Sequence, residues 1–131
     1  MIGLDSNIII RAITGDDPIQ SPSARSFLAT LSAERPGVIN SVVLVELAWT
    51  LRVRHKYPKR EILEQIENLL RSSAFYLVDR DAVSGALVVS QQHAIDFADA
   101  LIGEINRRVG CDTTMTFDQQ AARVRSFSPL Q

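Results

Sequence analysis

The chain has 131 residues, of which 46% are hydrophobic and 22% charged, and this composition fits one soluble globular domain over residues 1–131. The formal net charge of −1 gives no overall attraction to nucleic acid, so a polyanion would need a local basic patch or a bound metal. The lone Cys111 excludes an intrachain disulfide, and no apolar run reaches the roughly 20 residues of a membrane helix. With no secretion signal at the amino terminus, we expect a cytoplasmic protein without a membrane partner.

The first part of the chain alternates short apolar runs with helical patterns. Residues 2–4 predict a short buried strand, and residues 8–13 continue as apolar structure until the turn-forming residues 14–18. Next we expect a helix over residues 24–31 capped by Ser21 or Ser23, a strand at residues 38–39, and a helix from a cap at Ser41 to about residue 55.

The second part repeats this alternation. Residues 59–70 predict an amphipathic helix, because Ile62, Ile66 and Leu69 recur at helical spacing. We then expect a strand at 75–78, helices at 82–92 and 98–108, a strand at 113–117 and a closing helical turn or two at 118–124. Strands that alternate with helices predict an α/β fold with a mostly parallel central sheet and helices on both of its faces.

Four carboxylates interrupt or end the apolar runs of this frame. Asp5 ends the apolar start of the chain, Asp118 follows the last expected strand, and Glu46 and Asp99 lie within otherwise apolar helical segments. Burying an unpaired carboxylate costs several kcal/mol, and such a group usually takes up a proton instead. We therefore expect a divalent metal to gather the four acids. Asp5 and Asp118 fall at the carboxyl ends of strands, where open α/β sheets place their ligands.

Each acid also has a structural interpretation. Asp5 and Asp118 stand where an aspartate caps a following helix. Asp96 would cap the helix that contains Asp99, and an acid at the third position of a helix is favoured by the helix dipole. We accept the cap for Asp96 and favour a site role for Asp99, because the residues after it must face the core.

Glu46 is harder to explain by local structure. Its neighbours three and four places away are mostly apolar and include no cation, so only a salt bridge from elsewhere, to Arg11 or Arg25, would neutralise it. The case for a site comes from four such acids in one small α/β frame.

Four short motifs in order resemble a known family: IGLDSN, VLVELAWTL, DFADALI and TMTFDQQA. Together they are similar to the PIN-domain ribonucleases, most closely to the VapC-type toxins of bacterial toxin–antitoxin pairs, over nearly the whole chain. The resemblance implies a metal-dependent endoribonuclease, a hydrolase of RNA phosphodiester bonds. Its catalytic acids would be Asp5, Glu46, Asp99 and Asp118, with Asp5, Asp99 and Asp118 as metal ligands.

The resemblance also implies the surroundings and partners of the site. Ser6 and Thr116 match small hydroxyl positions beside the acids, where they would orient carboxylates or metal-bound water. The cofactor would be Mg2+ or Mn2+, because hard cations prefer oxygen ligands. A nuclease free in its own cytoplasm would be toxic, so a cognate antitoxin protein is implied, and we also expect a homodimer.

The densest basic segment of the chain is a candidate for RNA binding. It contains Arg52, Arg54 and Lys56, with Tyr57 available to stack on a base. The alternative is structural, because cations are favoured at the carboxyl end of any helix.

Two alternatives to the nuclease belong to other classes of function. Enzymes that phosphorylate an aspartate need a late lysine, whereas the only lysines here are Lys56 and Lys59, in the middle of the chain. The second alternative is a catalytically inactive PIN-like domain that acts as a protein-binding module. Metal binding separates this alternative from an active nuclease, because a relic site should neither bind manganese nor cleave RNA.

Overall fold

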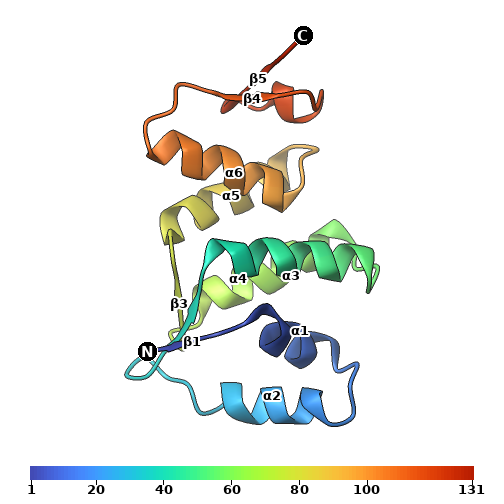
Figure 1. The fold of residues 1–131 in the computed structure, drawn as a ribbon, viewed down its shortest axis with the longest axis vertical. Helices are drawn as coiled ribbons and strands as arrows, with labels where there is room; N and C mark the ends of the chain where they lie inside the picture. Colours follow the sequence, from blue (N-terminus) through green and yellow to red (C-terminus); the bar gives the residue numbers. More distant parts are fainter. The chain divides into compact units, whose positions relative to one another are not determined.

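The computed structural model describes all of residues 1–131, and the chain divides into two compact units, Met1–Val78 and Asp79–Gln131 (Figure 1). The first unit contains β1 (Ile2–Gly3), α1 (Ser6–Thr14), α2 (Gln20–Leu28), β2 (Gly37–Ile39), α3 (Ser41–Val53), α4 (Lys59–Arg71) and β3 (Phe75–Leu77). The second unit contains α5 (Arg80–Gln92), α6 (Phe97–Arg108), β4 (Thr114–Thr116), the 3-10 helix η1 (Ala121–Arg123) and β5 (Phe127–Pro129).

The sheet of the first unit is three-stranded and fully parallel, in the order β1-β2-β3. Gly3 is in register with Val38, and Val38 with Tyr76. The pairing continues past β1, because the Leu4 N–H donates to the Val38 carbonyl at 3.0 Å. All three strands therefore end at the same edge of the sheet, and α1 and α3 begin there. The predicted α/β fold with parallel strands is confirmed.

The helices of the first unit form its core against one another and against the sheet. α1 packs on α2 and α3, and α4 packs on α3 and β3. α3 buries Leu44, Leu47 and Leu51 completely, and α4 buries Ile66 completely. Burial of these side chains, each worth about 1.5–3 kcal/mol, holds both helices in place.

Two predicted helix caps of the first unit are wrong. α2 begins at Gln20 rather than at residue 24, and neither Ser21 nor Ser23 caps it. Instead Asp17 Oδ1 accepts hydrogen bonds from the N–H groups of Ile19 and Gln20, at 2.9 and 2.7 Å. These bonds fix the backbone where α2 begins.

α3 is capped one residue earlier than predicted. Asn40 rather than Ser41 is its N-cap, since Asn40 has the extended backbone and its Oδ1 accepts the Val43 N–H at 3.1 Å. α3 ends at Val53, two residues before the predicted end.

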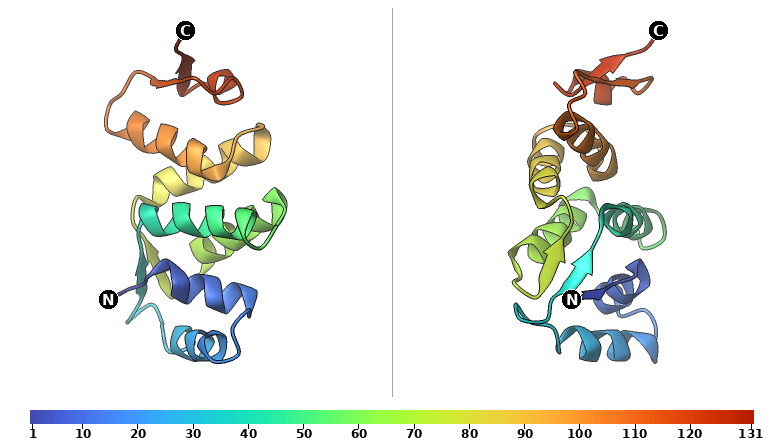
Figure 2. Two further views of the ribbon diagram at one scale, coloured as in Figure 1. Left: turned by 45° about the vertical axis from the view of Figure 1, so that its right-hand side comes forward. Right: turned by 60° about the vertical axis from the view of Figure 1, so that its left-hand side comes forward.

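The second unit is built on a pair of helices, α5 and α6, which lie side by side in both views (Figure 2). Their connection is fixed by the buried Ser90, whose hydroxyl donates to the Ile95 carbonyl at 2.7 Å. Leu101 of α6 and Val83 of α5 are fully buried. No helix in either unit combines the length and the apolar character of a membrane span.

The end of the chain differs from the prediction. β4 pairs in parallel with β5, a strand that the sequence did not predict, with Thr114 opposite Phe127 and Thr116 opposite Pro129. The expected helix over residues 118–124 shortens to the single 3-10 turn η1. The strands are thus all parallel, as expected, but they form a three-stranded and a two-stranded sheet.

Candidate active site

Asp5 lies just after β1 and is the N-cap of α1. Its Oδ1 accepts the Ser6 N–H at 2.8 Å and lies 3.5 Å from the Ser6 hydroxyl, while its Oδ2 accepts no hydrogen bond. Asp5 and Asn40 both follow strands that end at the same sheet edge, so the amino ends of α1 and α3 lie at the edge that carries Asp5. The cap interpretation of Asp5 is confirmed, and the cap leaves one carboxylate oxygen available.

Asp118 repeats this arrangement in the second unit. It follows β4, and its own N–H donates to the Thr116 hydroxyl at 3.0 Å. Its Oδ1 accepts the N–H groups of Gln120 and Ala121, at 2.8 and 3.2 Å, and starts the turn that becomes η1. Here too Oδ2 accepts no hydrogen bond from the chain.

Glu46 lies in the middle of α3 and is exposed. Neither arginine proposed as its partner reaches it: Arg11 pairs with Asp16 at 2.7 Å, and the Arg25 Nε donates to the Ala12 carbonyl at 2.8 Å. The salt-bridge alternative for Glu46 is therefore wrong. The carboxylate makes no hydrogen bond or ion pair within the chain.

Asp99 lies in the first turn of α6 and is half-buried, with Asp96 three residues before it. Asp96 occupies the N-cap position, and its backbone is extended there, but its side chain makes no capping hydrogen bond. Asp96 is thus the N-cap residue of α6, as predicted, although no hydrogen bond from its side chain caps the helix. Asp99 keeps the favourable interaction of an acid with the amino end of a helix.

The acids are less buried than their apolar neighbours in the sequence suggested. Asp5, Glu46 and Asp118 are exposed and only Asp99 is half-buried, so the expectation of four buried carboxylates is wrong. Asp5 and Glu46 belong to the first unit, and Asp99 and Asp118 to the second. No three carboxylate, histidine or cysteine side chains gather as a ready metal site.

The comparison with known families shows to which family the chain with these acids belongs. A model of the PIN domain matches residues 2–126, which include all four acids and most of both units. The chain belongs to the PIN-domain family. A comparison with curated proteins returned no significant match. PIN domains are generally nucleases and generally use divalent metals.

The carboxylate oxygens of this PIN domain are the type of donor that such a metal takes, although no three of them gather in this structure. Magnesium and manganese take hard oxygen ligands, and magnesium binds through one or two carboxylates while it keeps several waters. Asp5 and Asp118 each offer a free Oδ2 on a carboxylate whose other oxygen accepts backbone N–H groups, one in Asp5 and two in Asp118. Carboxylates that are already oriented lose little side-chain freedom when a metal binds.

The two hydroxyl residues predicted beside the acids make different contacts. Ser6 is buried and its Oγ approaches the Asp5 carboxylate. Thr116 accepts the backbone N–H of Asp118 rather than contacting the Asp118 carboxylate. Both hydroxyls thus lie beside an acid, and their assignment to orienting the site stays a prediction.

The basic segment of this PIN domain surrounds the end of α3. Arg52, Arg54 and Lys56 are exposed, whereas Tyr57 is half-buried. The Tyr57 ring meets the His55 ring edge to face, with centroids 6.4 Å apart. Because the Tyr57 ring is half-buried and contacts His55, the arginines and the lysine are the more accessible part of this segment.

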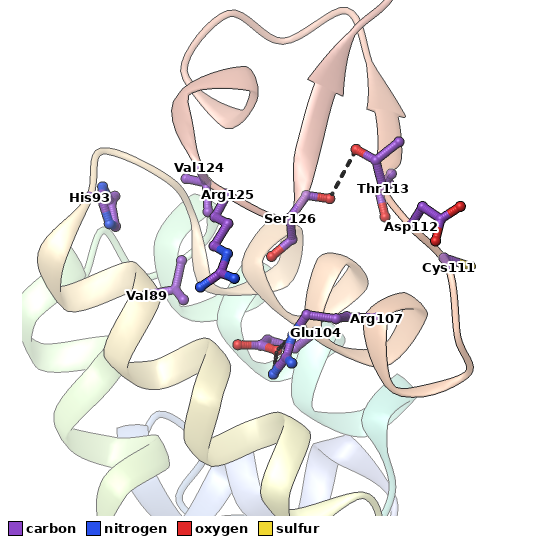
Figure 3. Close-up of a pocket in the computed structure, with 11 residues that line it drawn as sticks. Val89, His93, Glu104, Arg107, Cys111, Asp112, Thr113, Val124, Arg125 and Ser126 are labelled. Carbon is purple, nitrogen blue, oxygen red and sulfur yellow. Dashed lines mark hydrogen bonds and ion pairs between the residues drawn. The ribbon is translucent and has the colours of Figure 1, made fainter.

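Sequence reasoning missed the one acid that is buried. Glu104 of α6 is only 6% exposed, and its Oε2 accepts the Nε and Nη2 of Arg107 at 3.1 and 3.0 Å. Figure 3 shows this pair in a pocket of about 470 Å³ that Arg125 and Ser126 also line. The sequence signal was a Glu–Arg pair three residues apart on one helix, which is common on helix surfaces.

The burial of Glu104 depends on a glycine of the neighbouring helix. A Cβ at Gly85 of α5 would lie 2.7 Å from Glu104 Oε1, so only glycine leaves room for the carboxylate where it now lies. Glu104 is therefore part of the α5–α6 contact, which distinguishes it from the exposed acids of the quartet.

Proposed function

We propose that this chain is a metal-dependent endoribonuclease that hydrolyses RNA phosphodiester bonds with Mg2+ or Mn2+. Asp5, Glu46, Asp99 and Asp118 are its catalytic acids, and Asp5, Asp99 and Asp118 hold the metal. The observation that carries the proposal is that the carboxylates of Asp5 and Asp118 are held in the same way. Each carboxylate follows a parallel strand and leaves Oδ2 for a ligand, while Oδ1 accepts one backbone N–H in Asp5 and two in Asp118.

The proposed reaction requires a nucleophile stronger than neutral water and a counter-charge for the oxyanion that develops. A divalent ion held here would supply both. It would lower the pKa of the water molecule bound to it, and it would coordinate an oxygen of the phosphoryl group. The chain contributes orientation. The Ser6 N–H fixes Asp5, and the turn into η1 fixes Asp118, so neither carboxylate has to be ordered by the metal.

Glu46 would have a different part from the anchored aspartates. It is exposed and has no partner within the chain, so its oxygens are available to accept a hydrogen bond from water or from substrate. We place it as the acid that orients water rather than as a direct ligand. The exposed Arg52, Arg54 and Lys56 would contact the RNA backbone, with a smaller contribution from Tyr57.

The test compares single-residue variants on RNA with the metal controlled. Asp5→Asn and Asp99→Asn should each abolish cleavage of single-stranded RNA and lower the affinity for manganese measured by calorimetry. Both variants should keep the far-UV circular dichroism spectrum of the parent. Full cleavage by either variant, or cleavage that persists in excess chelator, would exclude this assignment.

The biological role proposed for the nuclease is that of a VapC-type toxin, acting in the cytoplasm as a homodimer under the control of a cognate antitoxin. The support is the resemblance of the four motifs. A planar guanidinium pairs with carboxylates bidentately, so an antitoxin arginine is the expected group at the exposed acids.

A groove of the first unit offers a place for the rest of the antitoxin. It has a volume of about 530 Å³ and lies between α1 and α2, where Ile8, Phe27 and the 80% exposed Ile19 line it. Asn7, two residues after Asp5, also lines it. An apolar segment in this groove would bring an adjacent arginine toward Asp5.

Co-expression with the small open reading frame beside the gene tests this role. The partner should bind more weakly when manganese is present, when its arginines are replaced, or when Ile19 carries a charge. Sedimentation of the nuclease alone tests the homodimer. If manganese, replacement of the partner's arginines and a charge at Ile19 all leave the affinity of the partner unchanged, the partner binds a surface away from the acids.

A further inference from the structure

The pocket of the second unit contains polar groups that the proposed nuclease site does not use (Figure 3). Its volume of about 470 Å³ lies in the range of pockets that hold small ligands. Its charged side chains are two arginines and two acids, Arg107, Arg125, Glu104 and Asp112, and His93 also lines it. This balance of charge argues against a simple anion or cation. It favours a ligand that carries both hydrogen-bond donors and acceptors.

Glu104 supplies an unused acceptor in this pocket. Its Oε2 accepts both hydrogen bonds from Arg107, and its Oε1 accepts none. The only fully buried side-chain polar atom without a hydrogen bond is Ser41 Oγ, so Glu104 Oε1 is not sealed off and is reached from the pocket that Glu104 lines. Leaving an acceptor of a largely buried side chain without a donor is costly, so a ligand that donates to Oε1 is favoured.

Arg125 supplies unused donors in the same pocket. Its side chain makes no hydrogen bond or ion pair within the chain, and Figure 3 shows it pointing toward Glu104 and Val89. A guanidinium is a planar fork that pairs with two adjacent acceptors. Val89 and the buried Val124 add apolar surface for a flat ring. The ligand that fits is therefore flat, with donors on one edge and a pair of acceptors on another.

We propose that this pocket binds a guanine base of the single-stranded RNA substrate. Guanine has N–H donors on its Watson–Crick edge, for Glu104 Oε1, and the adjacent acceptors O6 and N7 on its other edge, for the Arg125 fork. The other bases do not match, because adenine has an amino donor where guanine has O6, and the pyrimidines have no N7. Unstacked bases of single-stranded RNA are available for recognition of this kind.

The pocket lies close to the two proposed catalytic acids of the same unit. Glu104 is five residues after Asp99 on α6, which is a rise of about 7 Å along the helix. Thr114 lines the pocket four residues before Asp118, which is about 13 Å along an extended chain. The inference rests on the proposed nuclease function. It adds a preference for RNA that has a guanine within a few nucleotides of the cut.

The test measures binding of short fluorescent single-stranded RNAs in excess chelator, where no cleavage interferes. One good bidentate contact is lost when adenine replaces the only guanine, so the parent should bind the guanine RNA about tenfold more tightly. Arg125→Gln should lose this preference and keep the fold, because Arg125 is exposed and bonds to nothing. Arg123→Gln is the matched control and should keep the preference, since Arg123 is also exposed but does not line the pocket.

Two further ligands identify the contact and the source of the base. An RNA with 7-deazaguanine lacks N7, so it should bind the parent as weakly as the guanine RNA binds Arg125→Gln, and the change should not weaken that variant further. Guanosine monophosphate should bind the parent more weakly than the guanine RNA, because it lacks the neighbouring phosphates.

Equal binding of the guanine and adenine RNAs by a parent that cleaves RNA would overturn the guanine site and leave the nuclease intact. An equal loss of preference in Arg123→Gln and Arg125→Gln would also overturn it, because the pocket would not be the source. Guanosine monophosphate that binds as tightly as the RNA would overturn the substrate assignment and make the pocket a site for a free nucleotide. A guanine preference that depends on Arg125, in a parent that cleaves no RNA, would support the pocket and exclude the nuclease.

Discussion

Asp5 and Asp118 are held in the same way, although they belong to different units. In each residue Oδ1 accepts a backbone N–H at 2.8 Å, from Ser6 and from Gln120 respectively, and Oδ2 accepts none. The hydrogen bond to Oδ1 caps the helix or turn that follows. The same side chain can therefore serve both as a cap and, through Oδ2, as a metal ligand. The two roles use different oxygens and can be separated by substitution.

Asp118→Asn should separate the cap from the metal site. Asparagine keeps an Oδ1 acceptor and caps about as well as aspartate, so the melting temperature without metal should stay near that of the parent. The rise in melting temperature on adding manganese should be lost, because the anionic ligand is gone. Thermal melts across a manganese titration measure both effects.

Asp118→Ala completes this comparison. It removes the cap as well, and should lower the stability without metal by about 0.5–2 kcal/mol. A manganese response in Asp118→Asn equal to that of the parent would show that this carboxylate does not bind the metal.

Glu46→Gln should remove most of the cleavage activity without destabilising the fold. Glu46 is exposed and has no partner, and surface substitutions of this kind usually change stability by less than about 0.5 kcal/mol. Glu64→Gln on α4 is the matched control, because Glu64 is also an exposed helical glutamate. Initial rates of RNA cleavage and melting temperatures should be measured for both. Equal rates for the two variants would remove Glu46 from the catalytic set.

Asp17 should make stability depend on pH in the acid range. The N–H groups of Gln20 and Ile19 hold the pKa of Asp17 below its ordinary value of 3.8. A carboxyl group whose pKa is lower in the folded than in the unfolded state stabilises the protein at any pH above the pKa of the unfolded state. This stabilisation is lost as the pH falls through the pKa of the folded state. The melting temperature of the parent should therefore exceed that of Asp17→Ala at neutral pH, and the difference should shrink as the pH falls below 3.8.

Asp17→Asn provides the control for this titration. It keeps an acceptor oxygen without ionising, so its melting temperature should follow pH less steeply than that of the parent. A difference between parent and Asp17→Ala that stays constant down to the lowest pH would exclude a titrating cap.

The regular elements were predictable because their signals are local. α4 was expected over residues 59–70 and runs over Lys59–Arg71, since Ile62 and Ile66 mark one face of a helix and Pro58 fixes its start. The three strands of the first unit were placed within one residue at each end. Short apolar runs between turn residues gave these positions.

The errors arose where the outcome depends on side-chain contacts or on three-dimensional packing. Asp17 rather than a serine starts α2, because its carboxylate reaches two successive N–H groups beyond Pro18. β5 ends in Pro129, a residue that argues against a strand, yet it lies at the end of the strand where its missing N–H costs little.

The burial of the acids was misjudged for a related reason. Glu46 stands within an apolar run, but Val42 and Trp49 on its side of α3 are exposed as well, at 67% and 49%. The buried Leu44 and Leu47 lie on the other side of the helix. Conversely, Glu104 is buried only because Gly85 on another helix makes room for it, which a linear pattern does not reveal.

Gly85 and Glu104 should therefore be energetically coupled. Replacing a helical glycine by alanine normally stabilises a helix by about 0.8–1 kcal/mol. In the parent, the new methyl group would lie 2.7 Å from Glu104 Oε1 and force the buried carboxylate to move, so Gly85→Ala should give little gain or a loss.

The coupling is measured by a double-mutant cycle in urea. In a Glu104→Ala background the obstruction is gone, and Gly85→Ala should then be stabilising relative to Glu104→Ala alone. The same effect of Gly85→Ala in both backgrounds would show that the two side chains do not compete for this space.

The most direct test of the central claim is cleavage of a defined single-stranded RNA by the purified chain, with manganese, with magnesium and with excess chelator, followed by mapping of the cut ends. The account predicts internal cuts that require either metal, disappear in chelator and are absent from Asp5→Asn, Asp99→Asn and Asp118→Asn. Cleavage that survives chelation, or an intact RNA under every metal condition while the protein remains folded, would contradict it.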